Sequence, residues 1–259
     1  MSQHEIIHEL MYRSGIIAQM ASLEKLGNTW AKRYSRNLES LDSSEHREVF
    51  DHIGLWARTV VTPAFSQEYL KADITSAFES SSTDALVTAL DFFRSPAWEQ
   101  YEQAIAKMRT SYGQQHMARQ LATMRNQQEA PSIALKRQQL LRLTREYELL
   151  MLLTWDASEH FAAPLERLLP QNLLQTAEQK STMRQSFESH LKQRLEVRYK
   201  YIFHELPQWI LEGHLRFFNS PSGRHFVSLR QQALTTALSR AEQRAVQSLQ
   251  EHRNALEGP

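Results

Sequence analysis

Apolar residues recur along most of the chain at the three- and four-residue spacing that one face of an amphipathic helix requires. No persuasive segment alternates apolar and polar residues as a half-buried strand does. The pattern therefore predicts an all-α protein, a bundle of roughly ten helices with no sheet.

Cap and breaker residues predict the elements before residue 130. Asp42 and Glu45 have the spacing of a capping box, and Pro63 is expected to end the helix that they begin. The predicted helices run over 3–26, from Asp42 to Pro63, from Pro63 to Phe78, after a turn at 80–84 to Phe93, and from Pro96 towards Gln127.

The segment Glu129–Ser132 is the expected boundary between two halves of the chain, 1–130 and 131–259, packed as one globule. An apolar helix from Leu135 is expected to continue to Leu169, with a kink or break at Pro164. The remaining elements are a turn at 170–172, a helix through Phe187 and Phe203 to Pro207, a helix from Trp209 to Phe218, and a last helix from Pro221 to about His252.

A segment of the first half recurs in the second half. Residues 86–96 match residues 211–221 at an offset of 125 residues without a gap, and six of the eleven positions are identical. The identical pairs are Leu86/Leu211, Leu90/Leu215, Phe92/Phe217, Phe93/Phe218, Ser95/Ser220 and Pro96/Pro221. We interpret the match as a duplication that produced two multi-helix halves.

The repeated segment predicts a helix, a cap and a second helix. In each copy two leucines and the second phenylalanine share one helical face, which is expected to be buried. Ser95 and Ser220 are suited to accept hydrogen bonds from the free amides of the following helix. Pro96 and Pro221 then fall at the first helical position, where a missing N–H costs nothing. A structural role is the expectation for all of these residues.

The two corners resemble the bacterial domain-of-unknown-function 2059 family, in which paired aromatics are followed by Ser-Pro, often by glycine two positions later, and then by an aromatic. Residues 217–226 match that pattern throughout, including Gly223, and residues 92–101 match except that Trp98 replaces the glycine. That departure predicts that the first corner packs differently. The resemblance, firm over about 64–108 and 189–240, implies an all-helical bacterial protein that is exported, and it implies no enzymatic activity.

Composition narrows the function classes. Only 15 of the 259 residues are glycine or proline, and there is no cysteine, which excludes thiol nucleophiles, disulfides and cysteine-based metal sites. A net charge of +1 gives no bulk electrostatic reason to bind nucleic acid or acidic membranes. A basic bias around Lys107, Arg109 and Arg119 is interrupted by apolar residues and indicates a solvated or oligomer-facing helix.

No apolar run reaches the ~18 residues of a membrane-spanning helix, so no transmembrane segment is expected. The amino terminus lacks a basic segment followed by an apolar one. We therefore expect a periplasmic protein if a signal peptide has been removed, and a cytoplasmic protein otherwise.

One zinc motif occurs, His4-Glu5-Ile6-Ile7-His8, in which two histidines one turn apart ligate the metal and the glutamate activates its water. Only three residues precede it, and the metzincin extension fails. Glu24 or Glu39 would serve as a third ligand only if the fold brought one of them near. His4 and His8 are therefore weak metal candidates, and an exposed helix face is the preferred interpretation.

Other chemistry has less support. A di-iron centre needs two Glu-x-x-His pairs, and Glu5-x-x-His8 is the only one. Asp156 and His160 are one turn apart and would orient a general base if they paired. Loops for nucleotide binding and serine nucleophiles are absent from the sequence, so neither a catalytic residue nor a cofactor is assigned.

Ser220, Gly223 and Arg224 form a candidate anion site at a helix N-terminus, although capping already explains the serine. Taken together, these observations favour a non-enzymatic interaction or accessory protein of the bacterial cell envelope, with an unidentified protein partner and a homo-oligomer as the open choices. The alternatives are a binder of an apolar small molecule or lipid in a helical cavity, and a zinc-dependent hydrolase that uses His4, Glu5 and His8.

Overall fold

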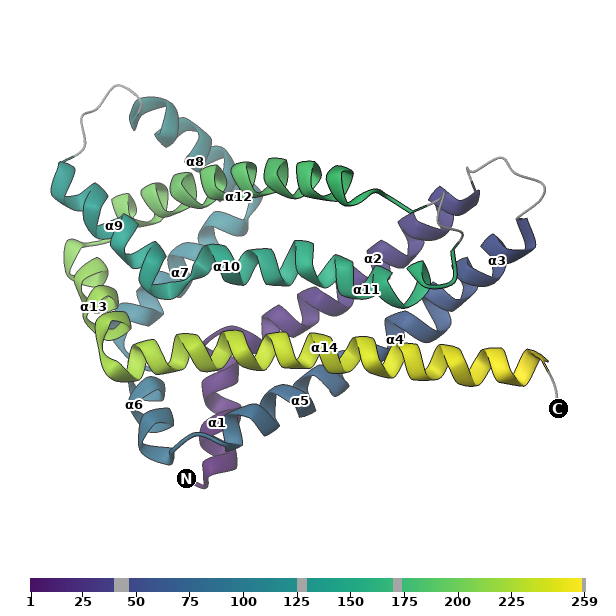
Figure 1. Ribbon diagram of the computed structural model, residues 1–259. Coiled ribbons are helices and arrows are strands. Elements are labelled where there is room, and N and C mark those ends of the chain that lie inside the picture. The colour runs from purple at the N-terminus through teal and green to yellow at the C-terminus, as the bar shows by residue number, and fades with distance from the viewer. Residues whose placement is uncertain (40–46, 125–129, 170–173, 258–259) are drawn as a thin grey trace. The chain divides into compact units, whose positions relative to one another are not determined.

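The computed structural model describes residues 1–39, 47–124, 130–169 and 174–257 (Figure 1). Every regular element in these ranges is helical, which confirms the all-α class and the absence of a sheet from the described chain. The chain divides into two compact units. Unit 1 comprises 1–14, 81–149 and 182–230, and unit 2 comprises 15–80, 150–181 and 231–259. Each unit draws on both sides of residue 130, so the two sequence halves stay a prediction.

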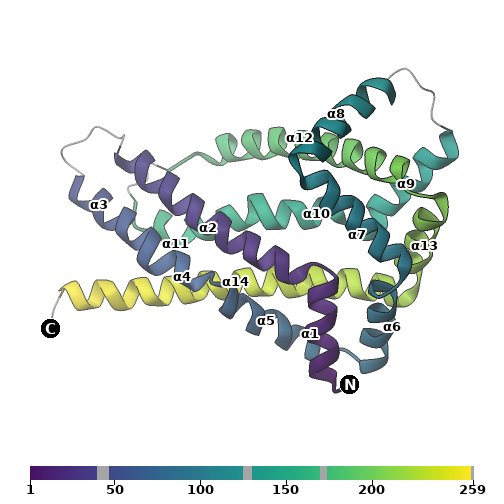
Figure 2. The same cartoon turned by 180° about the vertical axis from the view of Figure 1, so that it is seen from behind.

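Unit 1 contains two helix pairs, α1 on α6 and α9 on α13 (Figures 1 and 2). Helix α7 packs on both α13 and α8. The bounds of the helices that lie wholly in this unit are α1 Gln3–Arg13, α6 Thr83–Phe93, α7 Pro96–Arg109, α8 Ser111–Met124, α9 Pro131–Thr144 and α13 Gln208–Asn219.

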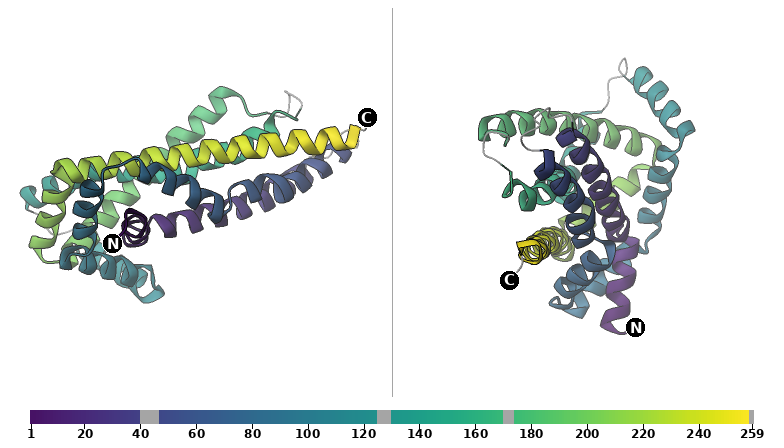
Figure 3. Two further views of the ribbon diagram at one scale, coloured as in Figure 1. Left: turned by 90° about the horizontal axis from the view of Figure 1, so that it is seen from below. Right: turned by 90° about the vertical axis from the view of Figure 1, so that its right-hand side faces the viewer.

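Unit 2 is built around α2, which packs on α3, α5 and α11 (Figure 3). Its core is aromatic: the Phe65 and Phe161 rings meet edge to face with centroids 4.5 Å apart, and Trp30 stacks on Tyr34 at 4.8 Å. The bounds are α2 Ile16–Glu39, α3 Arg47–Trp56, the π-helix η1 Ala57–Val61, α4 Thr62–Ala64, α5 Gln67–Glu79, the π-helix η2 Leu152–Asp156 and α11 Ala157–Glu166.

Three helices contribute residues to both units, and they are α10 Glu146–Met151, α12 Ala177–Glu205 and α14 Pro221–Glu257. Helix α12 ends two residues before Pro207, as predicted, and α14 continues five residues past the predicted end near His252. Helix α6 ends at the predicted Phe93, and α13 ends at Asn219, one residue past the predicted Phe218.

The predicted helix over 3–26 is two helices. Helix α1 begins with a capping box between Ser2 and Glu5 and ends at Arg13, where the Ser14 amide donates to the Leu10 carbonyl. Gly15 then has φ +80°, a left-handed conformation that glycine adopts without steric cost. The apolar spacing alone does not reveal this break, because apolar residues lie on both sides of it.

The predicted helix from Pro96 towards Gln127 is also two helices, because Thr110 caps a new one. Its hydroxyl accepts a hydrogen bond from the Gly113 amide at 3.0 Å and donates one to the Lys107 carbonyl at 2.7 Å. A Cβ at Gly113 would lie 2.0 Å from that carbonyl oxygen, so only glycine fits this corner.

Two proline predictions are wrong in position. The helix before Pro63 includes the proline and ends at Ala64, and the next helix begins at Gln67 instead of at Pro63. The π-helix η1 precedes Pro63, and Thr62 donates both its amide and its hydroxyl to the Ala57 carbonyl. Pro164 lies inside α11 and breaks nothing; the break in that apolar stretch is at Arg145, whose φ is 47°. The capping box at Asp42 and Glu45, the start of the 129–132 boundary and the turn at 170–172 lie outside the described residues.

Candidate functional site

Both predicted serine caps are present in unit 1. The Ser95 hydroxyl accepts from the Trp98 amide at 3.3 Å, and the Ser220 hydroxyl accepts from the Gly223 amide at 3.1 Å. The Ser220 hydroxyl also donates to the Phe217 carbonyl at 2.6 Å. Pro96 and Pro221 each open the following helix, so the capping predictions are confirmed.

The third helical residue distinguishes the corners. A Cβ at Gly223 would lie 2.0 Å from the Phe217 oxygen and 2.8 Å from the Phe218 Cα, so this corner closes too tightly for any side chain. At the equivalent position the first corner holds Trp98, whose indole N–H donates to the Arg13 carbonyl at 2.9 Å. The two corners therefore differ, as the substitution predicts.

The paired phenylalanines of one corner pack against those of the other. Phe92 and Phe217 stack with centroids 3.9 Å apart and planes 5° apart. The cross contacts match: Phe92 meets Phe218 at 5.4 Å and 74°, and Phe93 meets Phe217 at 5.9 Å and 75°. Leu90, Phe93 and Phe218 are buried, whereas Leu215 is only half-buried, so one member of the predicted buried face is partly exposed.

His214 lies beside this stack, and no motif in the sequence marks it as a candidate. Its ring lies within 4.8–6.3 Å of five aromatic rings and is 1% exposed. Nδ1 lies 2.8 Å from the Ile210 carbonyl and so carries the proton, while Nε2 has no hydrogen-bond partner in the described chain. Burial lowers the pKa of His214 to about 4, which keeps the ring neutral. The five surrounding residues are Phe92, Trp98, Tyr101, Phe203 and Phe218.

A buried cation lies in the same unit. Arg230 is 7% exposed, donates to the Thr144 carbonyl at 3.0 Å and lies over the Phe226 ring at 5.6 Å. Burial lowers its pKa, and burial raises the pKa of Tyr101 to about 12. The hydrogen bond from Arg230 to the Thr144 carbonyl joins α14 to the end of α9.

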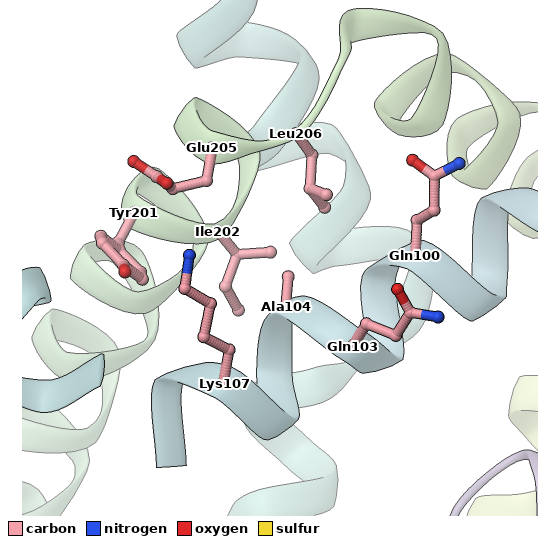
Figure 4. Close-up of a pocket in the computed structure, with 8 residues that line it drawn as sticks. All are labelled: Gln100, Gln103, Ala104, Lys107, Tyr201, Ile202, Glu205 and Leu206. Atoms are coloured by element: carbon pink, nitrogen blue, oxygen red, sulfur yellow. The ribbon is translucent and has the colours of Figure 1, made fainter. Parts of the chain in front are cut away.

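A pocket of about 230 Å³ opens between α7 and the last turn of α12 (Figure 4). Its α7 wall consists of positions at the helical spacing of three and four, and its α12 wall contains Tyr201, whose hydroxyl lies 2.9 Å from His116 Nδ1. Burial, with a smaller contribution from Glu205, raises the pKa of Tyr201, so the phenol is neutral. The lining residues are Gln100, Gln103, Ala104, Lys107, Tyr201, Ile202, Glu205 and Leu206.

The zinc candidates are exposed on α1. The Glu5 carboxylate accepts a hydrogen bond from the Ser2 amide at 2.7 Å as part of the capping box. This hydrogen bond lowers the pKa of Glu5. No three or more His, Asp or Glu side chains in the described ranges are arranged to hold a metal ion. The side chain of Glu39 lies outside the described residues, and Glu24 belongs to unit 2.

His160 pairs with a residue that sequence spacing did not indicate. Its Nδ1 lies 2.7 Å from Oε2 of Glu242, a carboxylate on α14. Arg167 also donates a hydrogen bond to Glu242 at 3.4 Å, and Lys180 donates one to Glu159 at 3.2 Å. Each ionic group here has a protein partner, which is the arrangement of an ion-pair network between helices.

At the candidate anion site, the Gly223 amide is already taken by the Ser220 hydroxyl, and Arg224 is exposed. The basic segment after Lys107 lies on α7 and α8, and most of its α8 residues are exposed. The pocket residues of α7 were missed because each is an ordinary surface residue; their shared face was the only available signal.

None of the described helices combines the length and apolarity that crossing a bilayer requires. Comparison of the chain with protein-family models, with curated proteins and with solved structures finds no match to any of them.

Proposed function

We propose that the protein is a non-enzymatic, protein-binding component of the bacterial cell envelope, related to the family that its two corners resemble. The observation that carries the binding role is an exposed tryptophan in unit 1: Trp209, at the start of α13, is 48% exposed. Leu135 on the partner helix α9 is 64% exposed. Tryptophan is enriched among the side chains that contribute most to protein–protein binding, and Leu135 adds apolar surface on the neighbouring helix.

The helices that present these side chains are fixed to each other. Helix α9 packs on α13, and Lys136, next to Leu135, lies 2.8 Å from Glu212, which is three residues after Trp209. Gln208 donates to the same carboxylate at 2.8 Å. A rigid pair of helices presents an apolar anchor at little entropic cost on binding, which favours recognition of a partner protein.

The paired corners support the duplication that we propose. Phe92 stacks on Phe217, its counterpart 125 residues later, and the two cross contacts of the paired phenylalanines have similar geometry. The pairs α1–α6 and α9–α13 extend the correspondence to neighbouring helices. A duplicated helical frame is a sound scaffold for an accessory protein, and the cell-envelope address rests on the family resemblance alone.

The test is site-specific photocrosslinking in native bacterial envelopes, with the crosslinker placed at position 209 and, as control, at the exposed Thr88 on α6. We expect a discrete adduct from position 209 that is lost in a Leu135→Ser background and absent from position 88. A second copy of the chain as the adduct would identify a homo-oligomer. No adduct above a mock sample would overturn the proposed binding role.

The two other candidate functions receive less support from the geometry. The pockets described in the two units have about 230 and 300 Å³ and polar rims, whereas a lipid requires a larger apolar cavity. For the zinc hydrolase, comparing the zinc content of the wild type with that of His8→Ala remains the deciding measurement, and equal contents would eliminate it.

A further inference from the structure

The pocket between α7 and α12 has two opposite charges at its mouth. In Figure 4 the Lys107 side chain extends from α7 towards α12, where the Glu205 carboxylate lies beside Tyr201. Within the described residues neither Lys107 nor Glu205 has an ion-pair or hydrogen-bond partner for its side chain. By contrast, Lys136, Lys180 and Arg244 all have carboxylate partners at 2.8–3.2 Å.

The rest of the lining separates into an apolar floor and a polar end. Ile202 is fully buried, and it forms the floor with Ala104 and Leu206. Gln100 and Gln103 line the end away from Tyr201, and their amides also have no partner in the described chain. The hydrogen bond between His116 Nδ1 and the Tyr201 hydroxyl, at 2.9 Å, holds the Tyr201 wall of the pocket in place.

The last turn of α12 adds to the charge pattern. Glu205 is its final residue, and Pro207 has no N–H to donate to the carbonyl four residues before it. The free carbonyls give this end of α12 a partial negative charge, which favours a cation beside Glu205. Lys107, across the mouth, favours an anion.

We propose that this pocket binds a small zwitterion, an α-amino acid with a short apolar side chain. Its ammonium group pairs with Glu205 and the end of α12, its carboxylate pairs with Lys107, and its side chain covers Ala104, Ile202 and Leu206. The volume of about 230 Å³ is smaller than the ~300–1,000 Å³ of drug-sized sites and matches a ligand of this size. A peptide terminus carries only one of the two charges, so it leaves either Lys107 or Glu205 without a partner.

Isothermal titration of the full chain with L-leucine, 4-methylpentanoate and 3-methylbutylamine tests the proposal. The last two probes are leucine without its ammonium group and leucine without its carboxylate. We expect saturable leucine binding with a dissociation constant at or below about 1 mM. Each of the other probes should bind at least about fivefold more weakly, because it loses one charge-assisted contact at a partly exposed site.

Two variants assign the charges. Lys107→Gln should remove the advantage of leucine over the amine, and Glu205→Gln should remove its advantage over the carboxylate. Both side chains are exposed, so neither change should prevent folding. The matched controls are Lys25→Gln, in unit 2, and Glu99→Gln, on α7 outside the pocket, which should leave binding unchanged.

Three results would overturn the proposal. The first is an absence of saturable leucine binding up to 10 mM, about tenfold above the expected constant. The second is equal binding of the three probes, which would indicate an apolar groove without charge recognition. The third is leucine binding that neither pocket variant weakens, which would place the ligand elsewhere on the protein.

Discussion

The two Ser-Pro corners of unit 1 share their cap and differ three residues later. At the second corner Gly223 lets α14 fold back so closely that the Phe217 carbonyl occupies the place of a side chain. At the first corner Trp98 occupies that place and instead contacts Phe93, at 4.6 Å between ring centroids, and donates to the Arg13 carbonyl. One corner is thus held by close backbone approach and the other by an aromatic side chain.

The difference separates the residues that both corners need, the serine and the proline, from the residue that varies with how closely the two helices meet. The serine hydroxyl caps the next helix and the proline opens it, and neither role depends on what packs nearby, so both copies retain them. The residue at the third helical position instead faces the end of the preceding helix, so its size is set by how closely the two helices meet. Thr110 and Gly113 repeat the close form at a corner outside the repeated segments.

The largest expected effect is at the glycine of the close corner. Gly223→Ala places a Cβ against backbone atoms that cannot move independently, so we expect a loss of about 3–5 kcal/mol in the free energy of unfolding, or failure to fold. Urea denaturation measures it. The control is Gly213→Ala on α13, where the new Cβ would meet only Ala97 Cβ at 3.5 Å. That change should be neutral or stabilise by up to about 1 kcal/mol, and equal losses at both glycines would contradict the prediction.

The second largest effect is a pH dependence of the free energy of unfolding at His214. Its counterpart in the first repeated segment, Ala89, does not titrate. The unfolded chain binds a proton at His214 with the ordinary pKa of 6.5, and the folded chain only near pH 4. The free energy of unfolding therefore falls as the pH drops from 6.5 to 4, by about 3 kcal/mol in total, and is unaffected by this group above pH 6.5.

Urea denaturation at pH 7 and pH 5 measures this loss. His214→Phe keeps an aromatic ring and removes the titration, so its stability should fall less over this interval than that of the wild type. His4→Gln, at an exposed position, should behave like the wild type. An unchanged pH dependence in His214→Phe would show that other groups cause it.

The features of this fold that the sequence predicts are those set by residues close together in the chain. Ser95 and Ser220 were assigned as caps from their place before a proline, and a cap needs only the residues of its own turn. Ser220 is also followed three positions later by glycine, and Thr110 and Gly113 have the same spacing. That spacing predicts the division of the 96–127 segment into two helices. The break at Gly15 carries a similar local signal.

Features that depend on distant residues were not predictable. His160 pairs with Glu242, 82 residues away, because the fold brings α11 and α14 together at this point. Residue spacing along the chain does not indicate such a contact. The neutral state of His214 comes from rings on α6, α7, α12 and α13, and the pocket at Lys107 and Glu205 exists only where two helices meet. The π-turns η1 and η2 leave the apolar pattern almost unchanged, so periodicity does not reveal them.

A smaller effect should distinguish the two caps. Ser95→Ala removes one hydrogen bond, to the Trp98 amide, and should cost about 1 kcal/mol. Ser220→Ala removes two, to the Gly223 amide and to the Phe217 carbonyl, and should cost closer to 2 kcal/mol. Thermal or urea denaturation of both variants provides the comparison, and restoring each hydroxyl as threonine should recover most of the loss. A cost at Ser95 equal to or greater than that at Ser220 would contradict this account.

The smallest effect concerns Arg94, which precedes the first cap where Asn219 precedes the second. Arg94 Nε donates to Glu9 at 2.9 Å, and Arg13 donates to the same carboxylate at 2.7 Å. The hydrogen bonds from Arg94 and then Arg13 lower the pKa of Glu9 to about 2. The stability that this carboxylate contributes is therefore complete above pH 4.5 and is lost as the pH falls from 4.5 to 2.

Arg94→Asn copies the second corner and removes the main cause of that shift. Because both side chains are partly exposed to solvent, we expect a cost of at most about 1 kcal/mol, which 1 M salt should abolish. The decisive measurement is an NMR titration of the Glu9 carboxyl, whose pKa should rise towards 4.5 in the variant while Arg13 retains part of the shift. A pKa that stays near 2 would show that Arg13 and the end of the helix suffice, and that the first corner gains nothing from its arginine.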